Sequence, residues 1–133
     1  MLVTVWRVSA TSFQVNSFIK DFELEPVKTF LEGEKTATGR ILASSGFNLG
    51  LPDTETLAEL LAQVSAFLNR YRKPIQALNK LGIESTLDIG LTVGGERHYT
   101  CSVSFPPSLL RELASLNVRL EISAYPSEGG LKV

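Results

Sequence analysis

The sequence predicts a single α+β domain, because helical and strand periodicities alternate along one short chain. Its 133 residues fall within the size range of one domain. The hydrophobic content of 44% and the charged content of 20% are ordinary for a globular protein. The two strongest patterns are an amphipathic helix after Leu57 and an alternating strand from Ile83 to Val93. We expect the domain to span residues 1–126 and residues 127–133 to form a loose tail.

The first part of the chain predicts three strands and one helix. Residues Val3–Ser9 mix apolar side chains on both parities, which is typical of a strand in the centre of a sheet. Ser12 is a candidate N-cap for a helix that carries apolar residues at i, i+3, i+4 and i+7. Residues Val27–Leu31 predict a short strand. Residues Arg40–Leu49 place apolar side chains on one parity and predict another strand.

The longest helix is predicted next. Asp53 can cap its first turn, and an unbroken apolar stripe runs from Leu57 to Tyr71. Pro74 lacks a backbone N–H and clashes with the preceding turn, so we expect the helix to kink or restart there. Gly82 is a typical helix stop.

The last part of the chain predicts a hairpin, a short helix and a final strand. Residues Ile83–Val93 alternate strictly, and Gly94-Gly95 predicts a tight turn into a second strand that ends at Phe105. Pro107 is tolerated in the first turn of the following helix, and Asn117 can adopt the left-handed conformation that ends it. Residues Val118–Ala124 alternate again and predict the last strand.

These elements predict a specific architecture. Their order is strand, helix, two strands, long helix, two strands, helix and strand, and strand-helix-strand units cross over right-handedly. The polar parity of the predicted hairpin implies that helices cover only one face of the sheet. The favoured fold is therefore a two-layer, ferredoxin-like α+β sandwich with a mostly antiparallel sheet.

Several residue runs together resemble the bacterial family catalogued as domain of unknown function 4279. The runs are Leu24–Lys28 leading to Gly33-Glu34, Ser45–Leu49, Leu57–Leu68 and Pro107–Tyr125. In that family the positions of Phe30 and Phe47 are typically Trp, and the position of Asn117 is typically Gly. The resemblance implies a bacterial origin and a small domain that stands alone. It implies no catalytic residue, because the function of the family is not established.

Composition argues against several classes of function. A formal charge of −1, with 13 basic and 14 acidic side chains spread along the chain, predicts no binding to nucleic acid or to anionic membranes. The first residues do not form a basic stretch followed by a long apolar core, so we expect no secretory signal. Cys101 is the only cysteine, which fits a cytoplasmic location.

No catalytic set, metal site or cofactor site is predicted from the sequence. On a strand, His98 and Cys101 point to opposite faces, which disfavours a nucleophilic pair and favours a solvent-facing histidine beside a core cysteine. Glu84 and Asp88 share one strand face and could in principle form an acid pair. The favoured interpretation is that these acids pair with Arg97 or Arg119 on a solvated sheet surface.

Two features suit a binding role better than catalysis. The helix-free face of the predicted sheet carries a polar surface, and the polar segment of residues 32–46 can project as a loop. Plain solvent exposure is the alternative interpretation of both features. The candidate binding residues are Thr86, Asp88, His98, Thr100 and Ser102.

The leading hypothesis is a non-enzymatic bacterial protein of the cytoplasm that binds another protein, for example as an immunity-type inhibitor of a toxin. The second hypothesis is a small-molecule sensor with a pocket between sheet and helices. An acid-dependent hydrolase ranks third. The sequence also leaves a homodimer open, because a polar sheet face can pair with its own copy.

Overall fold

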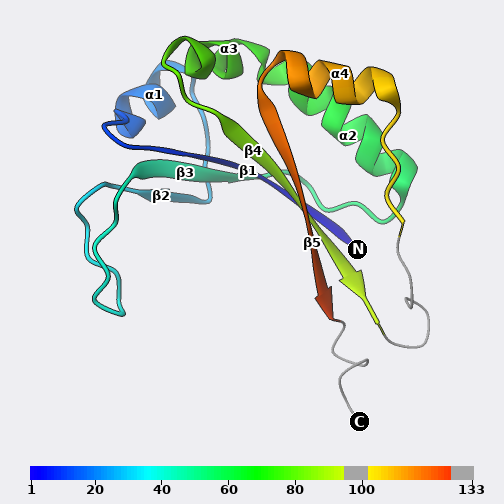
Figure 1. Ribbon diagram of the computed structural model, residues 1–133, viewed down its shortest axis with the longest axis horizontal. Helices are drawn as coiled ribbons and strands as arrows, with labels where there is room; N and C mark the ends of the chain where they lie inside the picture. Colours follow the sequence, from blue (N-terminus) through cyan, green and yellow to red (C-terminus); the bar gives the residue numbers. More distant parts are fainter. Residues whose placement is uncertain (95–101, 127–133) are drawn as a thin grey trace.

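The computed structural model describes residues 1–94 and 102–126, and it contains four helices and five strands within these ranges (Figure 1). In chain order the elements are β1 (Leu2–Ala10), α1 (Val15–Asp21), β2 (Lys28–Phe30), β3 (Ser45–Gly50), α2 (Leu57–Arg70), α3 (Arg72–Lys80), β4 (Ser85–Val93), α4 (Pro107–Ser115) and β5 (Val118–Pro126). The α+β class predicted from the sequence is confirmed.

The five strands form one mixed sheet in the order β2-β3-β1-β4-β5. The pairs β2/β3, β3/β1 and β1/β4 are antiparallel, whereas β4 and β5 are parallel and joined through α4. The helices lie on one side of the sheet, and the other side carries none of the described helices (Figure 1). The sheet is mostly antiparallel, as predicted.

Strand β1 lies in the centre of the sheet, as its sequence predicts, and anchors the core. Its even-numbered side chains from Leu2 to Val8 are buried toward the helices. Trp6 is fully buried and lies edge-on to Phe47 of β3 at 5.2 Å and to Phe67 of α2 at 5.3 Å between ring centroids. This aromatic cluster stabilises the contact between sheet and long helix, because edge-to-face packing adds to the burial of apolar area.

The predicted hairpin after β4 is wrong for the part of its second strand that the structure describes. Residues 95–101 lie outside the described residues, and residues 102–106 form no strand. Both edges of β4 are occupied, by β1 on one side and by β5 on the other. An antiparallel hairpin partner therefore has no free edge to pair with. Pairing of β4 with the distant strands β1 and β5 therefore overrides the turn that the local sequence predicts.

Two helices begin later than predicted, and neither uses the predicted cap. The predicted cap of α2, Asp53, is replaced by Thr56, whose hydroxyl oxygen accepts a hydrogen bond from the Glu59 backbone N–H at 3.1 Å. The Thr56 hydroxyl also contacts the Glu59 carboxylate at 2.9 Å. Helix α1 begins after Gln14, without a side-chain cap, so the predicted role of Ser12 is wrong.

The short helices end in the same way, with a left-handed residue after the last turn. Gly82 after α3 and Asn117 after α4 have φ values of 74° and 56°, as predicted for both positions. After α1 the same position holds Glu23, with φ of 52°. The Leu24 backbone N–H donates to the Ile19 carbonyl at 3.0 Å, which completes the usual Schellman pattern. Helix α1 therefore ends on a residue type that disfavours this conformation.

Strand β3 is shorter than predicted, since only its second half pairs with neighbours. The side chains of residues 40–44 alternate like a strand, but this segment belongs to the connection between β2 and β3. Gly46 begins the paired part, and a Cβ atom at this position would lie 2.0 Å from the carbonyl oxygen of Val8. Only glycine allows β1 and β3 to approach this closely.

Candidate functional site

Of the five residues predicted to form a binding surface, the structure describes Thr86, Asp88 and Ser102, while His98 and Thr100 lie outside the described residues. Thr86 and Asp88 lie on the same face of β4, opposite to its core residues. Ser102 is exposed but belongs to no strand. The structure thus brings two of the predicted residues together on the helix-free face and leaves the third off the sheet.

Asp88 is the best-anchored polar side chain of this face. It is only 5% exposed, and its Oδ2 atom lies 2.9 Å from a guanidinium nitrogen of Arg7 on β1. The Ser123 hydroxyl donates to Oδ1 at 3.2 Å from β5. Burial of a carboxylate is tolerated only when it is paired and hydrogen-bonded, as here. Asp88 therefore ties three strands together.

The other acid of the predicted pair, Glu84, is held separately. Its Oε1 atom lies 2.7 Å from a guanidinium nitrogen of Arg119, which is one of the two predicted partners. The second predicted partner, Arg97, lies outside the described residues. A hydrolase that used Glu84 and Asp88 together would first have to break two different ion pairs.

The connection between β2 and β3 folds into a hairpin, which we call the arm (residues 31–44). Backbone hydrogen bonds link Gly33 to Leu42 at 2.9 Å and Thr36 to Arg40 at 2.7 Å, and Gly39 turns the tip with φ of 88°. Figure 1 shows the arm on the side of the sheet opposite to the helices. The structure thus supports the predicted projecting segment for residues 32–44, which form a hairpin, and places residues 45–46 of the predicted loop in β3.

A groove of about 620 Å³ lies between the arm and the sheet. The sheet contributes Ser9, Lys28 and Phe30, and the arm contributes Lys35 and Arg40 among others. None of the three cations forms an ion pair with the described residues. The groove therefore has an excess of positive charge that the described part of the chain does not neutralise.

The same region carries exposed apolar side chains. Ile41 on the arm is 68% exposed, and Val27, just before the edge strand β2, is 75% exposed. Leu31 at the base of the arm is also exposed. Single exposed apolar residues are common on protein surfaces, but three of them between residues 27 and 41, the segment that also supplies the cations of the groove, mark a region suited to a partner.

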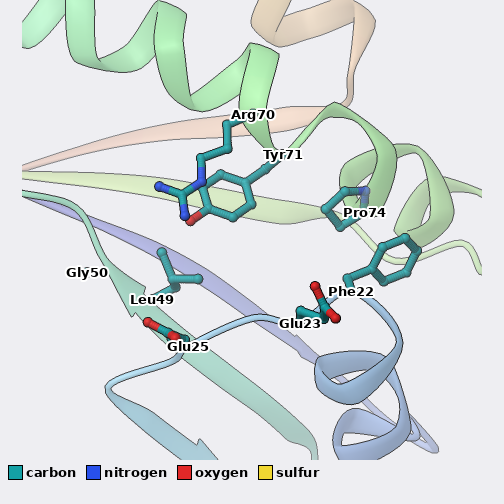
Figure 2. Close-up of a pocket in the computed structure, with 8 residues that line it drawn as sticks. All are labelled: Phe22, Glu23, Glu25, Leu49, Gly50, Arg70, Tyr71 and Pro74. Carbon is teal, nitrogen blue, oxygen red and sulfur yellow. The ribbon is translucent and has the colours of Figure 1, made fainter.

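A second cavity, of about 440 Å³, lies between the end of β3 and the junction of α2 with α3 (Figure 2). Phe22, Glu23 and Glu25 come from the segment after α1, and Arg70 and Tyr71 come from the end of α2. The lining is completed by Leu49, Gly50 and Pro74. This cavity lies between the sheet and the helices, where the second functional hypothesis predicts a pocket.

Opposite charges face this pocket from different elements. The Arg70 guanidinium lies 5.1 Å from the centre of the Tyr71 ring, an arrangement typical of a cation-π contact. In Figure 2, Arg70 and Tyr71 lie on one side of the pocket, and Glu23 and Glu25 lie on the other. Arg70 forms no ion pair with either acid. The pocket thus offers an anionic and a cationic wall.

Residues 1–94 and 102–126 contain neither a metal-binding cluster nor a membrane-spanning helix. No group of three or more His, Cys, Asp or Glu side chains in these ranges could hold a metal ion. No helix in this part of the chain is long and apolar enough to cross a membrane. The predicted opposite orientation of His98 and Cys101 falls outside the described residues.

Sequence reasoning missed the residues that charge the groove and the partner of Asp88. Lys28 and Lys35 look like ordinary surface lysines in the sequence, and they meet Arg40 only because the arm folds back. The signal that could have found them is the turn sequence Thr36-Ala-Thr-Gly39 between two short alternating stretches. Arg7 could be assigned to Asp88 only once the register of β1 and β4 is known.

Comparison with known proteins adds no information on the fold or on the candidate sites. No family model, no curated protein and no solved structure matches the chain. The resemblance to domain of unknown function 4279 therefore stays a prediction from the quoted residue runs.

Proposed function

We propose that this chain is a non-enzymatic module that binds another protein through the arm and the groove beneath it. The observation that carries the proposal is the groove between the arm and the sheet, which is lined by three cations that form no ion pair with residues 1–94 or 102–126. An immunity-type inhibitor, whose target is a toxin, belongs to this class of module.

The charge of the groove selects the chemistry of the partner. Lys28, Lys35 and Arg40 face Glu34 as the one acid of the lining, and the Glu34 carboxylate already accepts a hydrogen bond from the Leu31 backbone N–H. Unpaired cations that share one groove attract an acidic segment, because their potentials add within the screening length of about 8 Å. The proposed partner therefore presents an extended segment rich in Asp and Glu.

The exposed apolar side chains of the arm and of Val27, just before β2, supply the second part of the interaction. Protein interfaces combine an apolar centre with a charged or polar rim, and the apolar part contributes most of the affinity. Ile41 and Val27 lose exposed apolar area when a partner covers the arm and the β2 edge. The cations then fix the orientation of the partner and its rate of association.

The proposal is tested by affinity purification of the tagged full chain from a bacterial lysate, in parallel with the triple variant K28Q/K35Q/R40Q. A partner captured by the wild type should be lost with the triple variant, and its capture should weaken as salt is raised. The matched control is K73Q/K80Q/R111Q, which removes the same charge from exposed helical positions outside the groove.

Two results would contradict this assignment. Partners that bind the groove variant and the control variant equally well would place binding elsewhere on the molecule. A captured species that disappears after nuclease treatment would replace the protein partner with a nucleic acid. An I41S variant separates the apolar contribution, since it should weaken capture without changing the dependence on salt.

The pocket of Figure 2 supports a second candidate, the binding of a small molecule that carries both charges. Its volume of about 440 Å³ lies within the usual range for ligand sites. A ligand with one cationic and one anionic group would bridge the Glu23 and Glu25 wall to Arg70. A thermal-shift screen with zwitterionic metabolites tests this idea, because a true ligand stabilises the fold by mass action. The R70Q variant should abolish any shift found.

We further propose that β1, α1, β2, β3, α2 with α3, and β4 form a ferredoxin-like unit in a two-layer sandwich. Support comes from the antiparallel order β2-β3-β1-β4 and from the sequence of elements, which follows the β-α-β-β-α-β pattern of that fold. Helix α4 and β5 are then an addition to one edge. A cytoplasmic location is part of the same proposal and rests on the single cysteine.

A further inference from the structure

Strand β5 forms a long and regular edge of the sheet. It has nine residues, and β4 is its only strand neighbour among the described residues. The register with β4 runs without a bulge from Val118 to Pro126. Edge strands are usually protected by bulges, by lysines or by internal prolines, because their free N–H and C=O groups pair readily with another strand. Strand β5 has no lysine, and its proline is its last residue.

Strand β5 carries one basic and one acidic side chain that could pair with the same two side chains of a second copy. Arg119 and Glu121 lie on the helix-free face, two positions apart, and both are exposed. Glu121 is directly opposite Asp88 on β4, whose carboxylate is already paired with Arg7. Glu121 itself forms no ion pair within the described part of the chain. A cation placed beside Glu121 at the free edge would relieve this repulsion between carboxylates.

We propose that two copies of the chain pair through antiparallel β5 strands about a two-fold axis at Leu120. In this register Arg119 of each copy, whose guanidinium is paired with Glu84 of its own chain at 2.7 Å, lies opposite Glu121 of the other, so that each Arg119 bridges Glu84 and the Glu121 of the second copy. Leu120 meets its own copy, and Val118 lies opposite Ile122. Residues 118–122 of the two strands pair in this register, whereas residues 123–126 lie opposite residues 114–117 at the end of α4. This isologous pairing joins the two five-stranded sheets with all helices on the same side.

Other registers fit the side chains less well. An axis at Ile122 would set Arg119 opposite Tyr125 and Glu121 opposite Ser123, so no charge would find its complement. A shift by one residue would turn the core-facing side chains of one copy to the helix-free face of the other. The exposed apolar surface agrees with the first register, because Ile122 is 45% exposed at the edge and would be covered there.

This proposal is independent of the proposed function, because β5 and the arm lie at opposite edges of the sheet. It is tested on the full chain by size-exclusion chromatography with light scattering over a range of protein concentrations. The wild type should have the mass of a dimer. R119E and E121R should each have the mass of a monomer, since each places two like charges opposite each other.

The decisive measurement is the mixture of the two variants. R119E places acids at both positions and E121R places cations at both, so one copy of each forms two new ion pairs, and the equimolar mixture should recover the dimer mass. The double variant R119E/E121R should also dimerise alone. Circular dichroism and thermal unfolding verify that each variant is folded. A monomeric wild type at every concentration, or single variants that remain dimeric, would overturn the proposal.

Discussion

The two edges of the sheet differ in how they present the chain to the solvent. Strand β2 has three residues and leads into the arm, where side chains project and the backbone is hydrogen-bonded within the hairpin. Strand β5 has nine residues in continuous register with β4 and ends the sheet on its other side. The first edge offers charged and apolar side chains, whereas the second offers backbone groups in a regular array.

This difference teaches that one small sheet can support two kinds of recognition. Recognition at the arm depends on the side chains that the hairpin brings close to the sheet. Binding through side chains does not require a regular backbone. Strand pairing at β5 depends on regularity, because each N–H and C=O must find its counterpart. Substitutions at matched positions on the two sides of β1 can therefore separate the two regions by their tolerance.

The largest effect is expected for G46A, on the β3 side of the sheet. The new methyl group would lie 2.0 Å from the Val8 carbonyl oxygen and 2.8 Å from the Phe30 ring, so β1 and β3 must separate. We expect a loss of about 3 kcal/mol in the free energy of unfolding. Urea denaturation measures it, and a loss below about 1 kcal/mol would show that β3 can shift freely.

A smaller effect is expected from the ion pair that joins β1 to β4. R7Q leaves the Asp88 carboxylate buried without its cation, and we expect a loss of about 2 kcal/mol. D88N leaves Arg7 with 50% of its side chain in water, so a loss of about 1 kcal/mol should follow. Urea denaturation of R7Q and D88N measures the loss in the free energy of unfolding for each variant. Equal losses would contradict the assigned difference in burial.

A gain in stability is expected from E23G, at the end of α1. Glycine adopts the left-handed conformation of this position without strain, so the free energy of unfolding should rise by about 1 kcal/mol. The matched variant is N117G, where asparagine already tolerates the conformation and the change should be a few tenths of that size. Thermal unfolding of each variant measures the change in stability relative to the wild type. If Glu23 is kept for a ligand in the pocket, E23G should lose the ligand while gaining stability.

The smallest effect is expected for G90A, on the β5 side. Its methyl group would approach the Tyr125 ring at 3.1 Å, and this exposed ring at the edge can move aside. The free energy of unfolding should stay within about 0.5 kcal/mol of the wild type. A loss as large as that of G46A would mean that Tyr125 is fixed and that the two sides of the sheet do not differ in tolerance.

The sequence predicted most elements whose pattern is strong and local. The apolar stripe of α2 and the alternation of β4 were found because each has a periodicity that is visible within its own segment of the sequence, without knowledge of tertiary contacts. The predicted hairpin strand, which residues 102–105 do not form, shows the opposite case, since the two glycines that predict a turn cannot reveal that β5 occupies the edge of β4. Strand order depends on contacts between distant residues, which a periodicity does not contain.

The candidate sites were less predictable than the fold, for the same reason. The pair of Arg7 and Asp88 forms across two strands that are far apart in sequence. The alternation of residues 40–44 resembled a strand, yet this segment has an exposed Ile41 and belongs to the arm. Only the projecting segment itself, with its glycines and polar residues, could be predicted.

The buried aromatic cluster of β1 has a practical consequence for all of these measurements. Trp6 is the only tryptophan of the chain and is fully buried beside Phe47 and Phe67, far from water. Its fluorescence emission should be blue-shifted in the native protein and should move to longer wavelength only when the core opens. The protein thus contains an internal optical probe that reports global unfolding and stays silent when either edge of the sheet gains a partner.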